Sequence, residues 1–240
     1  MPGKPSKANR SIERAIDVLL ALAKVEQPVS VLELERLVNL NRPTLYRILH
    51  TLNSRGMVTS SAEPQRFRLG SRAVELARPW LGGNRLRSLA QPYLNELWEG
   101  TDETVALFVP GDGDTKVCIQ ELQSRQALVF TRGTGIVEPL IIGSSGKSIL
   151  AFQEAETIRD ILATIDGDRN RALIERDLVT IRKDGYSLTE GEVIAGAVAI
   201  SAPIFDRTGS VQASVSLYGP ATRLSGEHKV HCLDYLLQTS

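Results

Sequence analysis

Three consecutive segments with the apolar spacing of short helices lie between residues 11 and 56, and this pattern constrains the fold most. Gln27 and Pro28 end the first segment. The second segment opens at Ser30, a favourable N-cap residue, and Glu33 three positions later completes a capping-box pattern. The inward faces of these two helices would be formed by Ile12, Ala15, Ile16, Leu19, Leu20 and Ala23, and by Val31, Leu34, Leu37 and Val38.

The third segment carries polar and basic residues on its outer face. Asn41 is suited to be its N-cap, Pro43 fits the first turn, and Gly56 is placed to end the helix in a left-handed conformation. The inward positions are Leu45, Ile48, Leu49 and Leu52, and the outward positions are Arg42, Thr44, Tyr46, Arg47, His50 and Thr51. Two short helices followed by such a helix are typical of a helix-turn-helix, in which arginine pairs with guanine edges or phosphates.

Two short strands are predicted after this helix. Residues 57–59 and 66–69 flank a polar turn that contains Pro64, which indicates a wing beside the third helix. Arg66 and Arg68 of the wing would lie near a DNA backbone, and ordinary solvated surface is the alternative for each of them. With the basic residue that precedes the first helix included, the expected DNA contacts are Arg10, Arg42, Pro43, Thr44, Tyr46, Arg47, His50, Arg66 and Arg68.

The charges of the chain are divided unevenly between its two parts. The 240 residues include 28 Lys and Arg and 28 Asp and Glu, so the formal net charge is zero. Residues 1–90 hold 15 basic and 7 acidic residues, a net charge of +8, whereas residues 91–240 hold 13 basic and 21 acidic residues, a net charge of −8. The opposite signs suggest two domains with different partners, the first polyanionic, and chance variation of surface charge is the alternative.

The second part mixes strand and helix patterns. Aliphatic and β-branched runs predict strands at residues 104–109, 116–122, 127–131, 197–205 and 211–218. Helical patterns occur at residues 71–81, 84–98, 147–152, 155–165, 171–184 and 225–238. This order predicts an antiparallel sheet with helices on its faces, an α+β domain. Pro79 and Gly82-Gly83 interrupt the connecting pattern, so we expect domain boundaries at residues 1–70, 71–83 and 84–240.

Five stretches of the chain resemble transcription factors of the isocitrate lyase regulator (IclR) family. They are NRPTLYRILHTLNSRGMV (residues 41–58), RFRLGSRAVEL (66–76), PLIIGSSGKSILAF (139–152), IRKDGYSLTEGEVIAGAVAISAPIFD (181–206) and SVQASVSLYGP (210–220). The resemblance extends from about Ser11 to Gln238, and it places the arginine of the family's leader helix at Arg14. Nearly the whole chain therefore takes part in it.

The resemblance implies a ligand-responsive regulator of a catabolic operon. Residues 1–70 would be a winged helix-turn-helix that binds a double-stranded DNA operator, residues 71–83 a linker helix that helps dimerisation, and residues 84–240 a GAF-like effector-binding domain. A homodimer or a dimer of dimers is expected, because helix-turn-helix proteins usually read paired half-sites. The resemblance favours a repressor over an activator, a distinction that the sequence itself leaves open.

An effector site is expected where a helix begins near residue 147. Gly143, Ser144, Ser145 and Gly146 are small enough for a ligand to approach the backbone, and free N–H groups and the helix dipole favour a carboxylate or phosphate. A small-residue helix entry that serves packing alone is the alternative. The resemblance adds four further pocket positions, namely Thr189, Ala199, Ser216 and Tyr218.

These four positions bear on the size of the effector. Family members that bind small keto-acids commonly place acidic, thiol and hydroxyl groups there, and this chain keeps only the hydroxyl of Ser216. Thr189 and Ala199 carry no charge, and Tyr218 adds a flat apolar face with one hydrogen-bonding tip. We therefore expect a larger organic acid, an aromatic one among the candidates, rather than an acid of two or three carbons.

The sequence contains no coherent catalytic set. In GSSGKS (residues 143–148), the first glycine of a phosphate-binding loop would fall at Ile141, and the S-x-x-K run lacks its companion motifs. His228 and His231 have no evident third ligand, and Cys118 lies in a strand-like run, so we expect no metal site, no cofactor and no catalytic residue. An enzyme fused to a DNA-binding domain and an architectural DNA-binding protein without an effector are the alternatives.

The remaining features point to a cytoplasmic protein without a membrane partner. No apolar run approaches the length of a membrane span, and the basic N-terminus lacks the apolar stretch of a signal peptide. The two cysteines make no framework of disulfides or metal ligands.

Overall fold

The computed structural model describes residues 9–61, 63–82 and 85–239, without the side chains of residues 81 and 82. The chain divides into two compact units, residues 1–83 and residues 84–240, and each unit has its own hydrophobic core. Within these described ranges, none of the helices is both long and apolar enough to cross a membrane.

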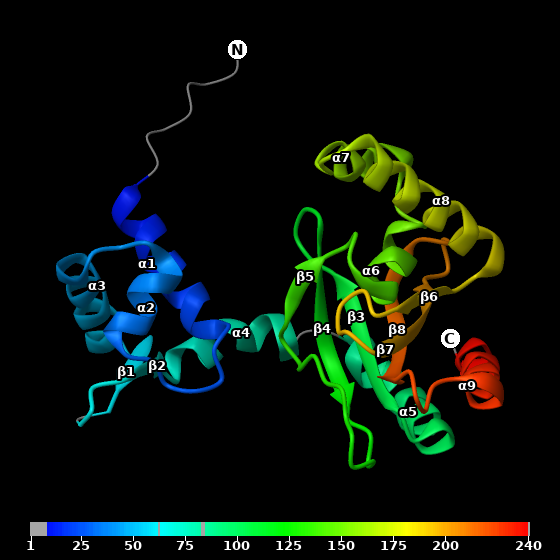
Figure 1. Ribbon diagram of the computed structural model, residues 1–240, viewed down its shortest axis with the longest axis horizontal. Coiled ribbons are helices and arrows are strands. Elements are labelled where there is room, and N and C mark those ends of the chain that lie inside the picture. The colour runs from blue at the N-terminus through cyan, green and yellow to red at the C-terminus, as the bar shows by residue number, and fades with distance from the viewer. Residues whose placement is uncertain (1–8, 62, 83–84, 240) are drawn as a thin grey trace. The chain divides into compact units, whose positions relative to one another are not determined.

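The first unit consists of helices around a small core and a short hairpin. Its elements are α1 (Arg10–Ala23), α2 (Val31–Val38), α3 (Arg42–Ser54), β1 (Val58–Ser60), β2 (Phe67–Leu69) and α4 (Arg72–Gly82) (Figure 1). Leu34, Leu45 and Leu49 are almost fully buried between the helices, and Val58 and Phe67 of the hairpin pack against them. Each of the three short helices therefore buries some apolar side chains against the others and against the hairpin.

The predicted inward faces of α1 and α2 are wrong in part, because Ile12, Ile16, Leu20 and Leu37 are exposed. The stripe of α1 that packs against the core is instead the i, i+4 pair Val18 and Leu22.

Hydrogen bonds at the caps confirm the predicted helix ends. The Ser30 hydroxyl accepts from the Glu33 amide at 3.3 Å, and the Glu33 carboxylate accepts from the Ser30 amide at 2.7 Å, so the capping box is complete. Asn41 Oδ1 accepts from the Thr44 amide at 3.0 Å. Gly56 follows α3 with φ +70°, the left-handed conformation that glycine adopts without strain.

Two features of the first unit were not expected from the pattern. Val29 forms a bridge with Phe67, with N–O distances of 2.9 and 2.7 Å, which ties the segment before α2 to the hairpin. Pro79 lies inside α4 and does not interrupt it. The missing N–H of the proline costs the helix one hydrogen bond, and the helix nevertheless continues to Gly82.

The second unit is a six-stranded antiparallel sheet with helices on both faces. In their order across the sheet, the strands are β5 (Val137–Pro139), β4 (Thr115–Leu122), β3 (Thr104–Pro110), β8 (Val211–Pro220), β7 (Ala197–Phe205) and β6 (Ser187–Glu190). The helices are α5 (Arg85–Thr101), α6 (Gly143–Leu150), α7 (Ala155–Ala163), α8 (Asp168–Asp184) and α9 (Gly226–Thr239) (Figure 1). The predicted α+β class is confirmed.

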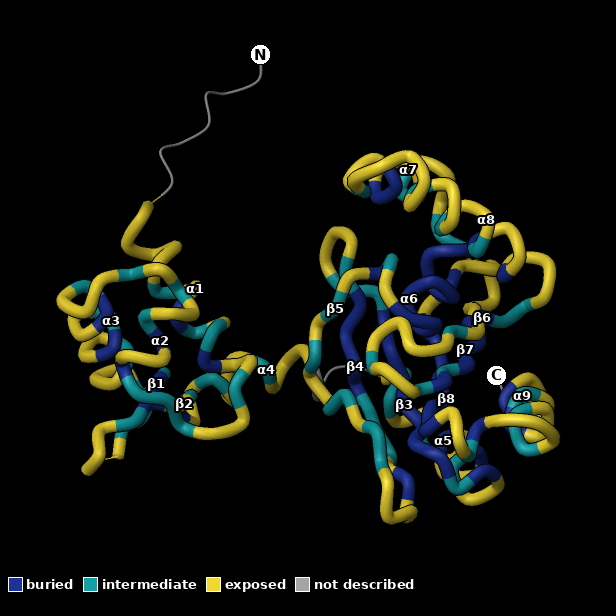
Figure 2. The backbone as a smooth tube through the Cα atoms, viewed as in Figure 1, coloured by how far each residue is buried: buried dark blue, intermediate teal, exposed yellow. Residues whose placement is uncertain are grey.

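Alternate residues of the central strands face the two helix layers. Val105 and Leu107 of β3 belong to the core that includes α5 and α9, whereas Ala106 and Phe108 belong to the core that includes α6, α7 and α8. This alternation follows from the two-residue period of a strand. Figure 2 shows the central strands and α6 as buried, while much of α7 and α8 is exposed.

The strand predicted at residues 127–131 is wrong. The Phe130 carbonyl accepts from Thr104 Oγ1 at 2.9 Å, and the Leu128 carbonyl accepts from the Arg223 guanidinium at 3.3 Å. Side chains therefore satisfy backbone groups that a strand would pair with a neighbouring strand.

Two strands of this unit and the start of one helix also differ from the prediction. The edge strands β5 and β6 were not predicted, because each is short and lacks a clear alternation. Helix α6 begins at Gly143 rather than at Lys147, so the small residues form its first turn. This turn is buried along its whole length, which makes close packing one reason for its composition.

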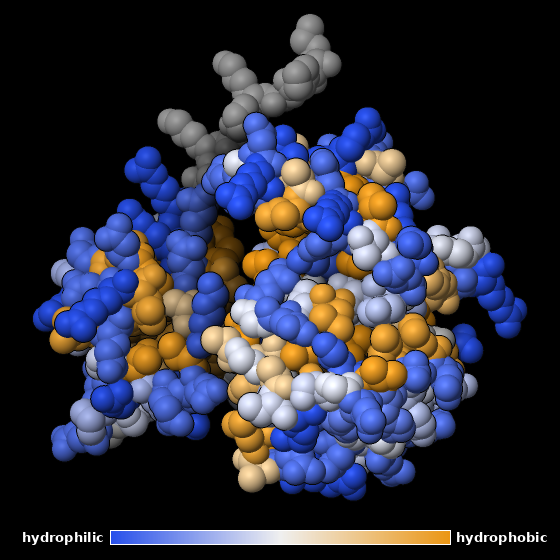
Figure 3. Space-filling view, turned by 45° about the vertical axis from the view of Figure 1, so that its right-hand side comes forward, coloured by the Kyte–Doolittle hydropathy of each residue, from blue (hydrophilic) through white to orange (hydrophobic). Residues whose placement is uncertain are grey.

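Several helices present apolar side chains to solvent. Figure 3 shows apolar side chains at the surface of each unit. The exposed ones include Ile12, Ile16 and Leu20 on α1, Val74, Leu76 and Trp80 on α4, and Leu89 and Tyr93 on α5. Groups of this kind are suited to contacts with a partner.

Candidate functional site

The outer face of α3 is open to solvent. Tyr46 is 49% exposed, and Arg47, His50 and Pro43 are exposed as well. Thr44 is half-buried, and its amide is taken up by the N-cap. The buried side of the helix fixes its position, and the side chains that can donate hydrogen bonds to phosphates or bases point outward.

Two of the expected DNA contacts are paired within the protein. Arg42 Nε lies 2.9 Å from Glu35 Oε2 on α2. Arg66 Nη1 donates to the Pro28 carbonyl at 2.9 Å and lies 3.4 Å from Glu33 Oε2, which ties the hairpin to the start of α2. Exposed ion pairs contribute little to stability, so Arg42 can leave Glu35 to bind a phosphate. Arg66 would have to break its hydrogen bond to the Pro28 carbonyl to do the same.

A hollow between α1 and α3 brings two arginines together. Arg14 and Arg47 line it, with hydroxyl groups from Ser11, Thr44 and Thr51. Both arginines are exposed and lie within one small domain, an arrangement that suits a phosphate group. Arg14 was indicated only by the family resemblance, because nothing in its local spacing distinguishes it.

Arg10 and Arg68 are the remaining two expected DNA contacts, and they lie on other elements of the first unit. Arg10 is the first residue of α1, and Arg68 alternates with the buried Phe67 along β2, so both arginines are exposed. The structure thus places all nine expected DNA contacts in the first unit, with seven of them exposed and Thr44 and Arg66 half-buried.

A cavity in the second unit lies between α6, the sheet and the loop that follows β6. Its walls include seven of the eight residues expected in an effector site, namely Gly143, Ser144, Ser145, Thr189, Ala199, Ser216 and Tyr218. Thr189, Ala199 and Tyr218 are direct neighbours across β6, β7 and β8. The volume accessible to water-sized molecules is about 50 Å³.

Gly146 is not part of these walls. A Cβ at this position would lie 2.3 Å from the Leu140 carbonyl oxygen, so the glycine allows α6 to approach that backbone. Gly143 does border the cavity, with φ +74°, and its Cβ would lie 3.0 Å from Val193 Cγ2. At residue 146, glycine therefore allows close packing of α6 against the backbone of Leu140. At residue 143, the absence of a side chain leaves the backbone amide at the wall of the cavity.

Lys116 of β4 is a buried cation in the wall of the cavity. Its side chain is 1% exposed, and its ammonium donates to the Ile142 carbonyl at 2.6 Å and to Ser145 Oγ at 2.8 Å. Burial, and then the nearby charge of Arg132, lower the pKa of Lys116 from 10.5 to about 7. A bound anion would favour the protonated form of this group.

Glu138 lies between two cations at the same wall. Its carboxylate forms an ion pair with Arg132 and lies 3.6 Å from Lys116 Nζ, which is its partner across β4 and β5. Arg132 Nε is buried and has no hydrogen-bond partner among the described residues. The wall therefore contains a donor that a ligand oxygen could satisfy.

The hydroxyl of Tyr218 is already committed within the protein. It donates to Glu121, which also accepts from Thr131 and from the amides of Arg132 and Gly133. Burial alone would raise the pKa of Glu121, but these hydrogen bonds outweigh it and lower the pKa. Tyr218 thus presents its ring rather than a free hydroxyl to the cavity.

The hydroxyl of Ser216 belongs to a chain of buried serines. Ser201 Oγ lies 2.8 Å from Ser216 Oγ and 2.6 Å from Ser144 Oγ on α6. This chain joins β8, β7 and the first turn of α6. A ligand that contacts Ser216 would therefore be coupled to the start of that helix.

Sequence reasoning missed the charged residues of the cavity. Lys116, Arg132, Glu138 and Glu192 all line it, and none was singled out. The signal at Lys116 was a lysine inside an apolar strand, which is rare unless the charge has a function or partners. Within the described ranges, no group of three or more His, Cys, Asp or Glu side chains is arranged to hold a metal ion.

Comparison with known families matches both units. The model of the bacterial transcriptional regulator IclR C-terminal domain matches residues 80–240, and that of the IclR helix-turn-helix domain matches residues 11–62. The HTH-type transcriptional regulator KdgR of Dickeya chrysanthemi is 30% identical over 228 residues, 91% of this chain and 73% of that protein. The transcriptional repressor IclR of Escherichia coli is 25% identical over 91% of this chain and 82% of that protein.

Solved structures show the same fold. Thermotoga maritima IclR superposes with a TM-score of 0.70 at 26% identity, covering 96% of this chain and 95% of that chain. An IclR transcriptional regulator from Alicyclobacillus acidocaldarius has a TM-score of 0.77 at 21% identity, covering 96% of each chain. The relatives are transcriptional regulators and not enzymes. This chain belongs to the IclR family of DNA-binding transcriptional regulators.

Proposed function

We propose that this chain is a repressor of a catabolic operon whose affinity for operator DNA is controlled by a small organic acid. The cavity beside α6 carries this proposal. Lys116, Arg132 and the amide of Gly143 all lie at its walls, and each favours an anion. An acid that binds one geometry of the protein better than another would change its affinity for DNA.

The acid is proposed to be larger than two or three carbons, with aromatic acids among the candidates. Thr189 and Ala199 contribute no charge to the cavity, and Tyr218 offers its ring because its hydroxyl is bonded to Glu121. The free space of about 50 Å³ is too small for a benzene ring. The proposal therefore requires the cavity to widen, and its exposed side is formed by the loop that contains Glu192.

The repressor assignment is supported by the relatives. One is the transcriptional repressor IclR of Escherichia coli, and another is the acetate operon repressor of Salmonella typhimurium, which is 25% identical over 91% of this chain. Reporter expression from the promoter upstream of the chain's own gene should rise when that gene is deleted. A fall in expression would instead identify an activator.

A DNA-binding assay with a panel of acids tests the effector. Fluorescence anisotropy would measure the affinity for DNA from upstream of the chain's own gene, with and without glyoxylate, pyruvate, benzoate or phenylacetate. We expect an aromatic acid to change that affinity. A response to glyoxylate or pyruvate alone would refute the size, and no response to any acid would favour an architectural protein without an effector.

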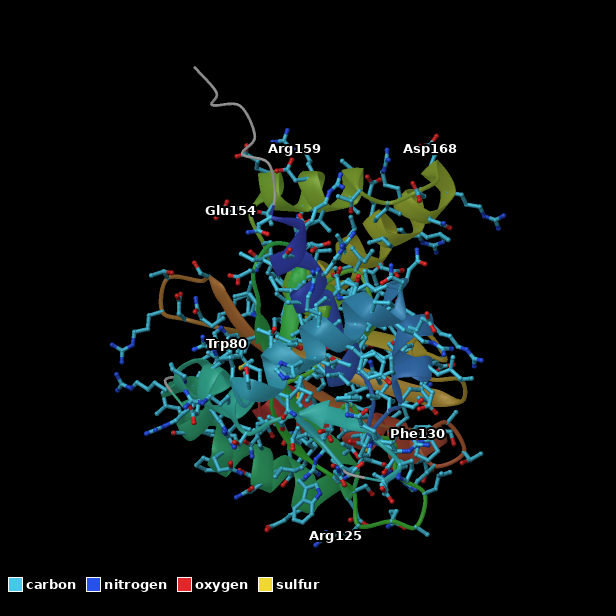
Figure 4. All side chains as sticks on the ribbon, turned by 90° about the vertical axis from the view of Figure 1, so that its left-hand side faces the viewer. Trp80, Arg125, Phe130, Glu154, Arg159 and Asp168 are labelled. Carbon is cyan, nitrogen blue, oxygen red and sulfur yellow. The ribbon has the colours of Figure 1, made fainter. Side chains whose placement is uncertain are left out.

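The proposed DNA surface is tested by a matched pair of arginines. Arg47→Ala should weaken operator binding by about tenfold, a loss typical of a phosphate or base contact. Arg159→Ala removes the same charge from the exposed face of α7 in the second unit (Figure 4) and should leave binding unchanged. Equal affinities for the two variants would contradict the assignment of Arg47.

We also propose a homodimer or a dimer of dimers. The apolar side chains exposed on α1 and α4, among them Ile16, Leu20 and Leu76, support an interface there. Light scattering after size exclusion should give a mass of two or four chains. A monomer at micromolar concentration would refute this assembly.

A further inference from the structure

The loop between β6 and β7 places a carboxylate on the first turn of α6. Glu192 Oε1 accepts a hydrogen bond from the Gly143 amide at 3.2 Å. Glu192 Oε2 lies 3.0 Å from the ammonium of Lys147, which is one turn further along α6. Glu192 lines the cavity together with its loop neighbours Val193 and Ile194. The group that the start of α6 would offer to an acid is thus already in contact with an acid of the protein itself.

We infer that Glu192 is an internal competitor for the effector, and that the carboxylate of a bound acid replaces it beside Gly143. This inference rests on the proposed function of the cavity as an organic-acid site. If the carboxylate of the acid and that of Glu192 both contacted the Gly143 amide, their like charges would be close together and would repel. Binding of the acid would therefore release the loop that carries Glu192.

The contacts of Lys147 make this exchange feasible. Its ammonium also lies 2.8 Å from Asp177 Oδ2 on α8, so the buried lysine keeps one carboxylate when Glu192 leaves. Burial alone would lower the pKa of Lys147, but the hydrogen bonds to Asp177 and Glu192 outweigh it and raise the pKa. The Gly143 amide, by contrast, would lose its partner unless the acid supplied an oxygen atom. The exchange thus conserves the hydrogen bond of Gly143 when the ligand supplies an acceptor oxygen, and an anion also replaces the charge that Glu192 placed beside Lys147.

The loop is held at its base, where the Gly191 amide donates to the Ala197 carbonyl at 2.7 Å and the Ala221 amide donates to the Gly196 carbonyl at 2.8 Å, so release of Glu192 would change only the segment between the two glycines. Gly191 and Gly196 enclose it with φ of +66° and +77°, and a Cβ at either position would meet no atom within 4 Å. Its residues are exposed or half-buried, and the side chain of Glu192 is 30% exposed. Release of Glu192 would also move Val193, whose Cγ2 lies against Gly143, and would widen the cavity.

Glu192→Gln tests the competition, with Glu190→Gln as the matched control. Glutamine keeps the shape of the side chain but removes the charge. Glu190 is two residues away and pairs with Lys229 at 3.2 Å outside the cavity, so its substitution removes the same charge from the same segment. Calorimetric titration with benzoate and with pyruvate should show at least about threefold tighter binding to the Glu192 variant, because like-charge repulsion and competition are both relieved. The control should bind as the wild type does, and equal or weaker binding by the Glu192 variant would overturn the inference.

Hydrogen exchange of the ligand-free protein tests whether Glu192 holds its loop against α6. Amides of residues 191–196 and of Gly143 should exchange faster in the Glu192 variant than in the wild type, and the Glu190 variant should match the wild type. Equal exchange in all three proteins would overturn the inference even if acids bind. If no acid bound to any of them, the proposed effector site would fail, and the exchange data would still report whether Glu192 holds the loop.

Discussion

Replacing Lys116 with methionine should change how the stability of the second unit depends on pH. Burial, followed by the charge of Arg132, lowers the pKa of Lys116 to about 7, whereas the unfolded chain keeps the ordinary value of 10.5. Between these values the unfolded state binds the extra proton, so the free energy of unfolding rises by up to about 1.4 kcal/mol per pH unit. The increase in the free energy of unfolding that comes from Lys116 is complete above pH 10.5, and it is lost as the pH falls toward 7.

The difference between the wild type and Lys116→Met isolates this effect. Between pH 7.5 and 9.5, the free energy of unfolding of the wild type should rise by about 2.5 kcal/mol relative to the variant. Other charged groups around the lysine, namely Glu138, Arg132, Glu192 and Lys147, are present in both proteins. Cys118 is also present in both proteins. Burial and the charge of Glu121 raise the pKa of its thiol to about 12, so its contribution to the pH dependence of unfolding nearly cancels in the difference between wild type and variant.

Urea unfolding followed by tryptophan fluorescence provides the measurement. Of the two tryptophans, Trp80 lies on α4 of the first unit (Figure 4) and Trp98 on α5 of the second. A Trp80→Phe background makes the signal specific to the second unit, which matters because a two-domain chain need not unfold in one step. Lys183→Met, at an exposed position of α8, is the control and should follow the wild type. Equal pH slopes for the wild type and Lys116→Met would refute the reasoning.

Three further substitutions test the packing of the two units by the same unfolding assay. Ser30→Ala removes the side-chain cap of α2 and should cost the first unit about 1 kcal/mol; an unchanged midpoint would contradict the cap. Arg223→Met removes hydrogen bonds of 2.5 and 2.6 Å from the fully buried Glu103 and leaves it only His228, at 3.5 Å, as a basic neighbour among the described residues. A loss of about 3 kcal/mol is expected in the second unit, and a smaller loss in Arg223→Met/Glu103→Gln. An equal loss in the double variant would argue against an unpaired charge. Gly146→Ala places a Cβ 2.3 Å from the Leu140 carbonyl oxygen and should destabilise the second unit by more than about 3 kcal/mol; tolerance of the alanine would show that α6 can shift.

Features fixed by short spacings were predictable from the sequence. The capping box of Ser30 and Glu33 and the left-handed Gly56 each depend on a few neighbouring residues, and the structure confirms them. The first unit is made of such local elements, so its pattern identified the fold. The family resemblance then supplied Thr189, Ala199 and Tyr218, which no local rule would have brought together.

The charged wall of the cavity depends on contacts that the sequence pattern does not contain. Lys116 and Glu138 face each other only because β5 pairs with β4, and β5 has three residues without a strand pattern. Glu192 reaches Gly143 across 49 positions of the chain. Each of these groups reads as an ordinary surface charge in isolation, so the pairing of edge strands and loops had to be known before the site could be assigned.

The distribution of charge favours an effector that carries a single carboxylate. Residues 91–240 have a net charge of −8, so an anion gains nothing from the domain as a whole and must be held by local groups. Three basic side chains at this wall, Lys116, Arg132 and Lys147, already face three carboxylates, those of Glu138, Asp177 and Glu192. A monocarboxylate that replaces Glu192 leaves the net charge of the wall unchanged. A neutral molecule would leave the Gly143 amide without an anion. A dianion would add an unpaired negative charge to a partly buried site. We therefore expect a monocarboxylic acid to displace Glu192 more readily than a neutral molecule or a dianion does.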